Sequence, residues 1–503
     1  MSDLKDRRGD QRTPPRSRIR PGNRLGRDRG LRFSDLRVAL FLLVVGCVRV
    51  PQPVVREEVH RPEVWVDAFS PPGGDGSSAH PLKAVPQPVP AASIVHLRTG
   101  LYPGPFVLGD GARLEGLGEV VLTGEAGQTV VTAANATLEG LSVQGGAIGL
   151  EAGAGVVVTR AHFSGQRKQA VVVHGSLSLS QTRLEASVEG IDGVVVDRGA
   201  SVELSSTKFT GGFRRAVLTD GGTLTLRNVT GEGPKTLVHA IDATNVLEGV
   251  RSVLGSGPAL FFASGTLRLA GAELSGHEYS VQLARGVDAT LSNVQARGAL
   301  EGCIAASASK LSVTASSFTG CGPGGALGLQ DCQAQVTNVE ITSSRELGIF
   351  ANRGTLGLLD VRISKIAADG EGALGDALHV RDGALVSSLG NLTFTDLGGS
   401  GLFASSFAEV RLASVSVERA RTSALFVERG AKVNIRALLV RGGAGPAVVV
   451  PDKASVDLES LSVSGGNEMP IYAECRAGAT VVLGRLESTV QQLSSLCVTM
   501  PRP

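Results

Sequence analysis

The sequence predicts an all-β protein, a right-handed parallel β-helix (solenoid) in which about three short strands fill each coil of 21–24 residues. A corner that contains Gly recurs along the chain, and alternating apolar stretches surround it, as in ALFVERGAKVNIRALLVRGG at residues 424–443. The composition agrees, because the 503 residues include 66 Gly, one Trp and only 4 % aromatic residues. Such a composition suits many small, similar coils better than one large core.

The recurring Gly, or the residue that replaces it, marks the coils. It lies at Gly175, Gly199, Gly221, Gly265, Gly286, Gly354, Gly383, Gly430 and Lys453. Neighbouring spacings are mostly 21 to 24 residues, with one of 29. Each unit carries three alternating apolar stretches, such as 425–427, 433–435 and 438–440, and alternation predicts strands with one buried face. The charged residues beside the corner glycines indicate solvated turns rather than a catalytic site.

The first 46 residues have the pattern of a secretion signal. They hold 12 Lys/Arg and 5 Asp/Glu, a net charge of +7, whereas residues 47–503 have a net charge of −5. The apolar run 38–45 is too short to span a membrane. Residues 44–47, Val-Val-Gly-Cys, resemble a bacterial lipobox, which implies cleavage after Gly46 and lipidation of Cys47. Two or three acyl chains suffice for a stable anchor.

The composition after Cys47 sets the other boundaries. Residues 47–62 contain Pro51 and Pro53 among mixed charges, which predicts an extended tether. Residues 63–130 are expected to form the N-terminal entry and cap, and residues 131–503 the β-helix with a C-terminal cap. The mildly acidic body gives no electrostatic case for a nucleic-acid partner. We expect a lipid-anchored protein of the bacterial cell envelope, at the outer membrane, without a cofactor.

The entry segment resembles the pectate-lyase-like β-helix superfamily. It contains Gly-Asp-Gly at 74–76, Pro-Leu-Lys at 81–83 and Gly-Leu-Tyr at 100–102. The resemblance covers about residues 63–497 and implies the fold, which hosts lyases, hydrolases, esterases, adhesins and inert spacers. In that superfamily a short helix usually follows the Pro-Leu-Lys piece. Three prolines in AVPQPVPAAS argue against that helix here.

The site motifs of the superfamily's enzymes are missing from the sequence. Galacturonan hydrolases use Asn-Thr-Asp, Asp-Asp and Gly-His-Gly, and the nearest match is Gly276-His277-Glu278. Pectin esterases use a Gln-Asp pair within a longer motif, of which only Gln330-Asp331 is present. Hydrolysis needs two carboxylates several ångströms apart, and adjacent coils show no such pair. The eight His are scattered without metal-ligand spacing.

One acidic insertion gives a weak calcium hypothesis. Asp369, Glu371 and Asp376 lie in the long coil KIAADGEGALGDALHV, and oxygen ligands at such spacing suit calcium. A solvated acidic loop is the alternative.

One outward column of strand residues is apolar, unlike the polar columns of the other strands. In the strand before the Gly corner it contains Phe261, Phe350, His379, Phe403, Phe426 and Tyr472. The flanking residues, such as Leu425 and Val427, are apolar almost without break, so they are expected to be the buried set. The column itself is then predicted to form an exposed apolar strip along the rod, beyond what monomers usually show.

Two hypotheses account for this strip. In the first, the tether or a loop covers it, or both sides of the strand are simply apolar. In the second, it is a docking surface, with aromatic side chains spaced about 4.8 Å apart, for an envelope protein or a polysaccharide. A Phe-rich, Tyr-poor column favours protein over glycan, because sugars prefer Trp and Tyr with a polar handle.

The six cysteines divide into three groups. Cys47 is assigned to the lipid. Cys475 and Cys497 lie 22 residues apart, about one coil, so a disulfide between them is expected to fasten the C-terminal coil. Spacing does not pair Cys303, Cys321 and Cys332, and buried thiols without a bond are the alternative.

These observations favour a membrane-anchored rod that serves as a non-catalytic binding or structural module. A polysaccharide lyase or glycoside hydrolase on the same scaffold is the alternative function.

Overall fold

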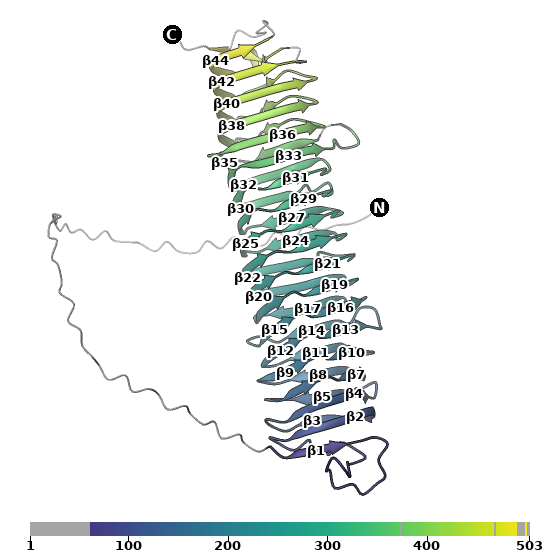
Figure 1. The fold of residues 1–503 in the computed structure, drawn as a ribbon. Helices are drawn as coiled ribbons and strands as arrows, with labels where there is room; N and C mark the ends of the chain where they lie inside the picture. Colours follow the sequence, from purple (N-terminus) through teal and green to yellow (C-terminus); the bar gives the residue numbers. More distant parts are fainter. Residues whose placement is uncertain (1–60, 373, 467–468, 490–497, 500–503) are drawn as a thin grey trace, which may run out of the picture. The chain divides into compact units, whose positions relative to one another are not determined.

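The computed structural model describes residues 61–372, 374–466, 469–489 and 498–499. In this part of the chain the strands follow one another along a single axis and form a right-handed parallel β-helix of about 17 coils (Figure 1). The predicted fold class is confirmed. Among the described residues the one helical element is the short 3₁₀ turn η1 (Cys475–Ala477).

The strands form three parallel sheets, which we call A, B and C in the order in which each coil visits them. Sheet A contains β3 (Phe106–Leu108), β5 (Thr129–Ala133), β8 (Ile148–Ala152), β11 (Gln169–Val173), β14 (Asp192–Val196), β17 (Arg215–Asp220), β20 (Thr236–Glu248), β22 (Leu260–Ala270), β24 (Tyr279–Ala284), β27 (Gly302–Ser307), β30 (Leu327–Thr337), β32 (Leu347–Leu359), β34 (Asp376–Arg381), β37 (Leu402–Ala404), β39 (Leu425–Val427), β41 (Val448–Val450) and β43 (Ile471–Ala473).

Sheet B begins at the N-terminal end of the rod. Its own strands are β1 (Glu63–Val66), β2 (Ile94–Pro103), β4 (Arg113–Gly124), β6 (Thr137–Glu139), β9 (Val156–Thr159), β12 (Ser176–Ser180), β15 (Ser201–Ser205), β18 (Thr223–Arg227), β25 (Asp288–Ser292), β28 (Lys310–Thr314), β35 (Leu385–Ser388), β38 (Glu409–Ala420), β40 (Lys432–Gly443), β42 (Ser455–Ser464), β44 (Thr480–Ser488) and β45 (Val498–Thr499).

Sheet C completes each coil. It contains β7 (Ser142–Gly145), β10 (His162–Ser164), β13 (Arg183–Ala186), β16 (Lys208–Gly211), β19 (Thr230–Glu232), β21 (Arg251–Val253), β23 (Glu273–Ser275), β26 (Gln295–Arg297), β29 (Ser317–Thr319), β31 (Glu340–Thr342), β33 (Val361–Ile366) and β36 (Asn391–Leu397). Strands β20, β22, β30 and β32 run on from sheet A into sheet B. Strands β2, β4, β38, β40, β42 and β44 run on from sheet B into sheet C.

Inward side chains of the three sheets form the core. In sheet A one inward position makes an unbroken stack: Val171, Val194, Val217, Val238, Leu260, Val281, Ile304, Leu327, Ile349, Leu378, Leu402, Leu425, Val448 and Ile471. Each of these side chains is at most 1 % exposed, and burying one contributes roughly 1.5–3 kcal/mol. The predicted burial of Leu425 and Val427 is confirmed, since both are 0 % exposed.

The turns between sheet A and sheet B explain why the recurring Gly is missing from some coils of the sequence. Gly199 and Gly430 have left-handed backbone, with φ of 80° and 77°, as the pattern predicts. Where the chain lacks a corner Gly, Asp242, Asp331 and Ser406 adopt the same conformation. Short polar side chains tolerate it because they hydrogen-bond locally.

The entry segment already belongs to the stack. Strands β1, β2 and β4 pair in parallel, and Leu82 forms a bridge to Val66. Tyr102 of the Gly-Leu-Tyr piece is buried, and its hydroxyl donates to the carbonyl oxygen of Arg98 over 2.8 Å. Residues 84–93 contain no helix, which confirms the expectation drawn from their prolines.

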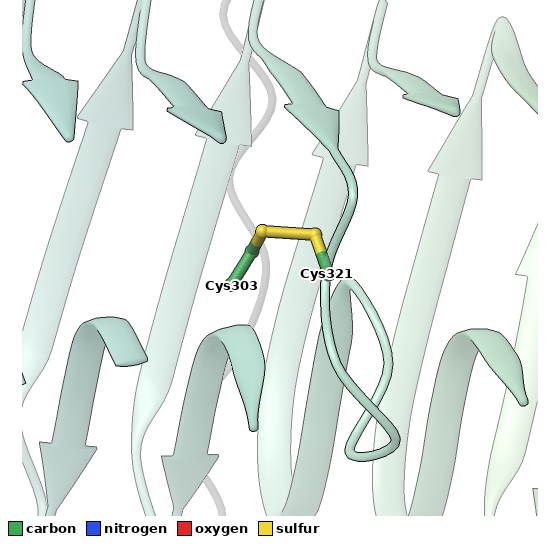
Figure 2. Close-up of a disulfide and its surroundings, with 2 residues drawn as sticks. All are labelled: Cys303 and Cys321. Atoms are coloured by element: carbon green, nitrogen blue, oxygen red, sulfur yellow. A yellow bond between two sulfur atoms is a disulfide. The ribbon is translucent and has the colours of Figure 1, made fainter. Parts of the chain in front are cut away.

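A disulfide joins Cys303 of β27 to Cys321, which follows β29, with Cα atoms 5.3 Å apart (Figure 2). This settles the pairing that spacing left open. Cys332 remains a buried thiol that donates to the carbonyl oxygen of Gln330 over 3.2 Å, and burial raises its pKa. The loop after Cys321 lies over sheet A, because a Cβ on Gly328 would come 3.3 Å from the carbonyl oxygen of Gly324.

Several predicted features lie outside the described residues: the signal segment 1–46, the lipidation site Cys47, the tether as far as residue 60, and Cys497. The pairing of Cys497 with Cys475 therefore stays a prediction. The part of the chain that the structure describes holds no helix of the length and apolar content that a membrane crossing requires.

Replacing Cys303 and Cys321 together by Ala is expected to loosen β27–β30. The bridge closes an 18-residue loop, and releasing such a loop in the unfolded state costs up to about 3 kcal/mol of stability. Amide hydrogen exchange of these strands measures the effect. The Cys332→Ala variant, which removes a thiol without opening a loop, is the control. Equal protection in the double variant and the wild type would contradict this role of the bridge.

Candidate functional site: the outward face of sheet A

In-register pairing places the predicted apolar column on the outward face of sheet A. From the N-terminal end it reads Val107, Thr132, Glu151, Val172, Val195, Leu218, His239, Phe261, Gln282, Ala305, Gly328, Phe350, His379, Phe403, Phe426, Val449 and Tyr472. Successive members lie about 4.8 Å apart. We call this set the column.

Four successive members form a continuous stack, which we call the aromatic ladder: Phe350, His379, Phe403 and Phe426. Ring centroids are 5.7 Å apart for Phe350 and His379, 4.4 Å for His379 and Phe403, and 5.3 Å for Phe403 and Phe426. The last two pairs are nearly parallel, with interplanar angles of 17° and 12°. The strip is less open than expected, because the Phe rings are half-buried and His379 is only 8 % exposed.

A buried carboxylate fixes the imidazole of the ladder. Asp376, which opens β34, is 3 % exposed and accepts from Nδ1 of His379 over 2.9 Å. Its second oxygen accepts from the backbone N–H of Ser400 over 2.7 Å. These two bonds satisfy the buried carboxylate and orient the imidazole for stacking on Phe403.

The stacking decides which part of each ring is available to a ligand. Phe403 has an aromatic ring on each side, so neither of its faces is open, and its edge is directed outward. A sugar that stacks on an aromatic residue needs an open ring face. In the middle of the ladder the rings therefore present their edges, whereas Phe350 follows Gly328 and has the guanidinium of Arg381 over its ring, 5.9 Å from the centroid.

The remaining predicted column residues lie apart from the ladder. Phe261 stacks on His239 of the preceding coil, with centroids 4.5 Å apart. Gln282, Ala305 and Gly328 separate this pair from Phe350. Tyr472, which is 40 % exposed, lies beyond Val449.

Two charged borders flank the column. We call the segments that lead from sheet C into sheet A the entry edge, and those that lead from sheet A into sheet B the exit edge. On the entry edge, Asp192 is 4 % exposed, and both Arg214 and Arg215 bind its two oxygens over 2.5–3.2 Å. Although burial opposes it, these arginines lower the pKa of Asp192.

His239 of the column lies close to this cluster. Burial is the main cause that lowers the pKa of His239, and the positive charge of Arg215 adds to it. The imidazole is thus held neutral, as an apolar column favours.

A histidine between two carboxylates lies on the exit edge. His174 contacts Asp197 over 2.6 Å through Nδ1 and Glu151 over 3.0 Å through Nε2. The hydrogen bond to Asp197 is the largest cause that raises the pKa of His174, and Glu151 adds to it. All three side chains are more than a third exposed, so the stabilisation that they provide is small.

The nearest matches to enzyme motifs have structural roles. His277 is fully buried inside the rod, where its Nε2 lies 3.0 Å from the hydroxyl of Ser252, also fully buried. Burial lowers the pKa of His277. Asp331 is ion-paired with Arg353 at a corner. Burial closes His277 to a substrate from solvent, whereas Asp331 is exposed and its carboxylate is engaged by Arg353.

The three acidic candidates for calcium do not act as one group. Asp376 is engaged by His379 and Ser400, whereas Asp369 accepts from the backbone N–H of Leu374 over 3.2 Å. Glu371 lies beside Asp369 in the same loop. Over the described residues, no group of three or more His, Cys, Asp or Glu side chains has a geometry that suits a metal. The calcium hypothesis stays a prediction.

Sequence analysis missed His239, Asp192 and Arg215 as parts of this face. The coil with His239 has Asp242 and Ala243 opposite the corner glycines Gly221 and Gly265 of its neighbours, so the Gly rhythm passed over it. Asp192 and Arg215 open their strands. The signal in the sequence that could have revealed the ion pairs is the Arg214-Arg215 pair, which follows Asp192 by one coil.

Replacing Asp197 by Asn is expected to lower the pKa of His174. In the wild type this pKa is raised above its ordinary value, so the protonated imidazole stabilises the fold at lower pH, and that contribution is lost as the pH rises through the folded-state pKa. An NMR titration of the His174 ring measures it. Asp288→Asn, whose carboxylate contacts Lys310 instead, is the control. A His174 pKa that is the same in both variants would contradict the assigned cause.

Comparisons with known proteins found similar solved structures but no family. No protein-family model and no curated protein matches the chain. A pectin methylesterase solved with a hexasaccharide matches at 10 % identity and a TM-score of 0.23, over 38 % of this chain and 80 % of that chain. The A-module of a mannuronan C-5 epimerase from Azotobacter vinelandii matches at 12 % identity and a TM-score of 0.19, over 81 % of this chain and 89 % of that chain.

A third similar structure is a lacto-N-biosidase from Eubacterium ramulus, at 8 % identity and a TM-score of 0.15, over 85 % of this chain and 67 % of that chain. Likeness at this level concerns the fold alone and carries no argument about activity. The chain shares the parallel β-helix scaffold with the methylesterase and the epimerase.

Proposed function

We propose that this protein is an exported, lipid-anchored β-helix rod whose sheet A face is a non-catalytic docking surface for a protein of the bacterial cell envelope. The observation that carries the proposal is the aromatic ladder, in which three half-buried Phe rings and the buried His379 lie in contact on the outward side of a sheet. Ring edges without a polar handle favour a protein partner.

One further feature supports export. The disulfide between Cys303 and Cys321 suits an oxidising compartment. The ladder lies eleven coil steps beyond Val107 in the column, which is roughly 50 Å along the rod. A rod anchored through Cys47 would hold the ladder well away from the tethered end.

One surface hollow is the feature that favours the alternative function, an enzyme that acts on a polysaccharide, although it holds fewer carboxylates than a glycoside hydrolase uses. A hollow of about 270 Å³ on the outward side of sheet B is lined by Gln335, Gly357, Ser387, Glu409 and Arg411, among others. Glu409 is the one carboxylate in this lining, whereas glycoside hydrolysis uses two. Release of reducing ends or unsaturated uronates from acidic polysaccharides would favour the enzyme.

The Phe403→Ser, Phe426→Ser double variant is expected to fold but to lose its partner. Each ring pair contributes about 0.5–1.5 kcal/mol beyond burial, a modest loss for a rod of many coils. The native size of the complex in gently solubilised envelopes measures docking, and circular dichroism checks the fold. Arg411→Ser, Asn434→Ser, two outward changes on sheet B, is the matched control. A complex of unchanged size in the ladder variant would remove the docking function.

The Cys47→Ser variant is expected to lose acylation and to leave the membrane fraction. Thioether-linked acyl chains provide the anchor, so metabolic labelling with a fatty acid and membrane fractionation measure it. Cys332→Ala, which retains Cys47, should keep both the label and the membrane association. Membrane association that persists in Cys47→Ser, with the acyl label intact, would contradict the anchor.

A further inference from the structure

The charges along the two edges of sheet A are distributed in blocks of opposite sign. Between residues 165 and 236 the entry edge carries Arg167, Lys168, Arg214, Arg215 and Lys235 against Glu189 and Asp192, a net charge of +3. At the same level, residues 151–242 of the column and the exit edge carry Glu151, Asp197, Asp220 and Asp242 against Arg198, a net charge of −3 with His174 neutral.

The basic block is contiguous, because its segments are hydrogen-bonded from coil to coil. The backbone N–H of Asp192 donates to the carbonyl oxygen of Lys168 in the preceding coil. In the same way, the N–H of Arg214 donates to the carbonyl oxygen of Ile191, and the N–H of Lys235 donates to the carbonyl oxygen of Phe213. Within the described residues, Arg167, Lys168 and Lys235 are in no ion pair. The charge of this block is therefore available to a partner.

Farther along the rod the signs are reversed. Between residues 276 and 375 the entry edge carries Glu278, Glu301, Glu346, Asp369 and Glu371 against Arg345, a net charge of −4. The exit edge at this level, residues 285–382, carries Arg285, Arg353 and Arg381 against Asp331 and Asp382, a net charge of +1. At both levels the two edges thus have opposite signs, with the apolar column between them.

We propose that the protein docked on this face is a second copy of the chain, parallel to the first and related to it by a two-fold axis along the rod. This inference deepens the proposed docking function and rests on it. Such an axis brings each coil opposite the same coil of the copy and sets the entry edge of one against the exit edge of the other. Opposite charges then meet at both levels, and the two columns pack against each other.

The antiparallel arrangement fits the column less well. If the basic block of one entry edge faced the acidic block of the other, the ladder would lie opposite the first coils of the copy. There the column carries Val107, Thr132 and Glu151, so a charged carboxylate would face the rings. In the parallel arrangement each ladder faces a ladder, and Glu151 faces Glu151 of the copy, nine coils away from Phe350.

Cross-linking of the full-length chain in detergent tests the geometry. In a parallel pair each column residue lies opposite its own copy, so Leu218→Cys and Phe403→Cys are each expected to form a disulfide-linked dimer. Thr225→Cys, on the outward side of sheet B, is the control for random contact. Dimers no more abundant than those of Thr225→Cys would overturn the proposal. So would dimers that require Leu218→Cys together with Ala305→Cys, the antiparallel pair.

Charge reversal tests the edges. Lys168→Glu with Lys235→Glu is expected to weaken the dimer about tenfold or more, because like charges then meet across the interface. Adding Asp197→Lys and Asp242→Lys should restore it. Sedimentation of the full-length chain measures the affinity, and a monomeric wild type or a failure of this restoration would overturn the proposal.

The two proposals fail in different ways. If the chain is monomeric and the Phe403→Ser, Phe426→Ser variant still loses an envelope complex, the second copy is wrong and the docking function remains. If that variant keeps every complex of the wild type, the docking function itself is wrong.

Discussion

Coil-to-coil hydrogen bonding is the constraint on which the rest of this structure depends. Each strand pairs in parallel with the strands one coil before and after it, so residues about 22 positions apart in the chain lie about 4.8 Å apart in space. A single coil has no core of its own, and its apolar residues are buried only when neighbours stack on it. The unbroken inward stack of Val, Leu and Ile side chains in sheet A is the direct result.

The same constraint organises the surface. An outward side chain meets the equivalent side chains of both neighbouring coils, and their attraction or repulsion is repeated along the rod. Arg227 lies between Glu203 and Glu248 of adjacent coils and pairs with both. Exposed pairs contribute little singly, but together they favour one register between coils over others.

In the aromatic ladder, the side chains that meet between neighbouring coils are aromatic rings instead of charged groups. Stacking covers both faces of Phe403, and Asp376 orients His379 for this contact. The face therefore differs from a glycan platform, in which ring faces stay open. A flat apolar stripe between two charged edges is the pattern of a protein interface, with an apolar centre and a polar rim.

The sequence alone determined the fold class, the inward positions and the composition of the column, because alternation and a repeat near 22 residues report local periodicity. It identified the aromatic residues of the ladder but overestimated their exposure, since stacking between coils removes ring faces from solvent. Only the tertiary structure decided which cysteines pair, because Cys303 and Cys321 lie 18 residues apart, less than one coil, and their Cα atoms come within 5.3 Å only in the folded chain. It alone also brought Asp192 to Arg214 and Arg215, and buried His277 with Ser252. Such contacts form only between side chains on the same face of the same or adjacent coils. Where another residue replaces the corner Gly, the repeat in the sequence no longer shows which residues belong to which coil.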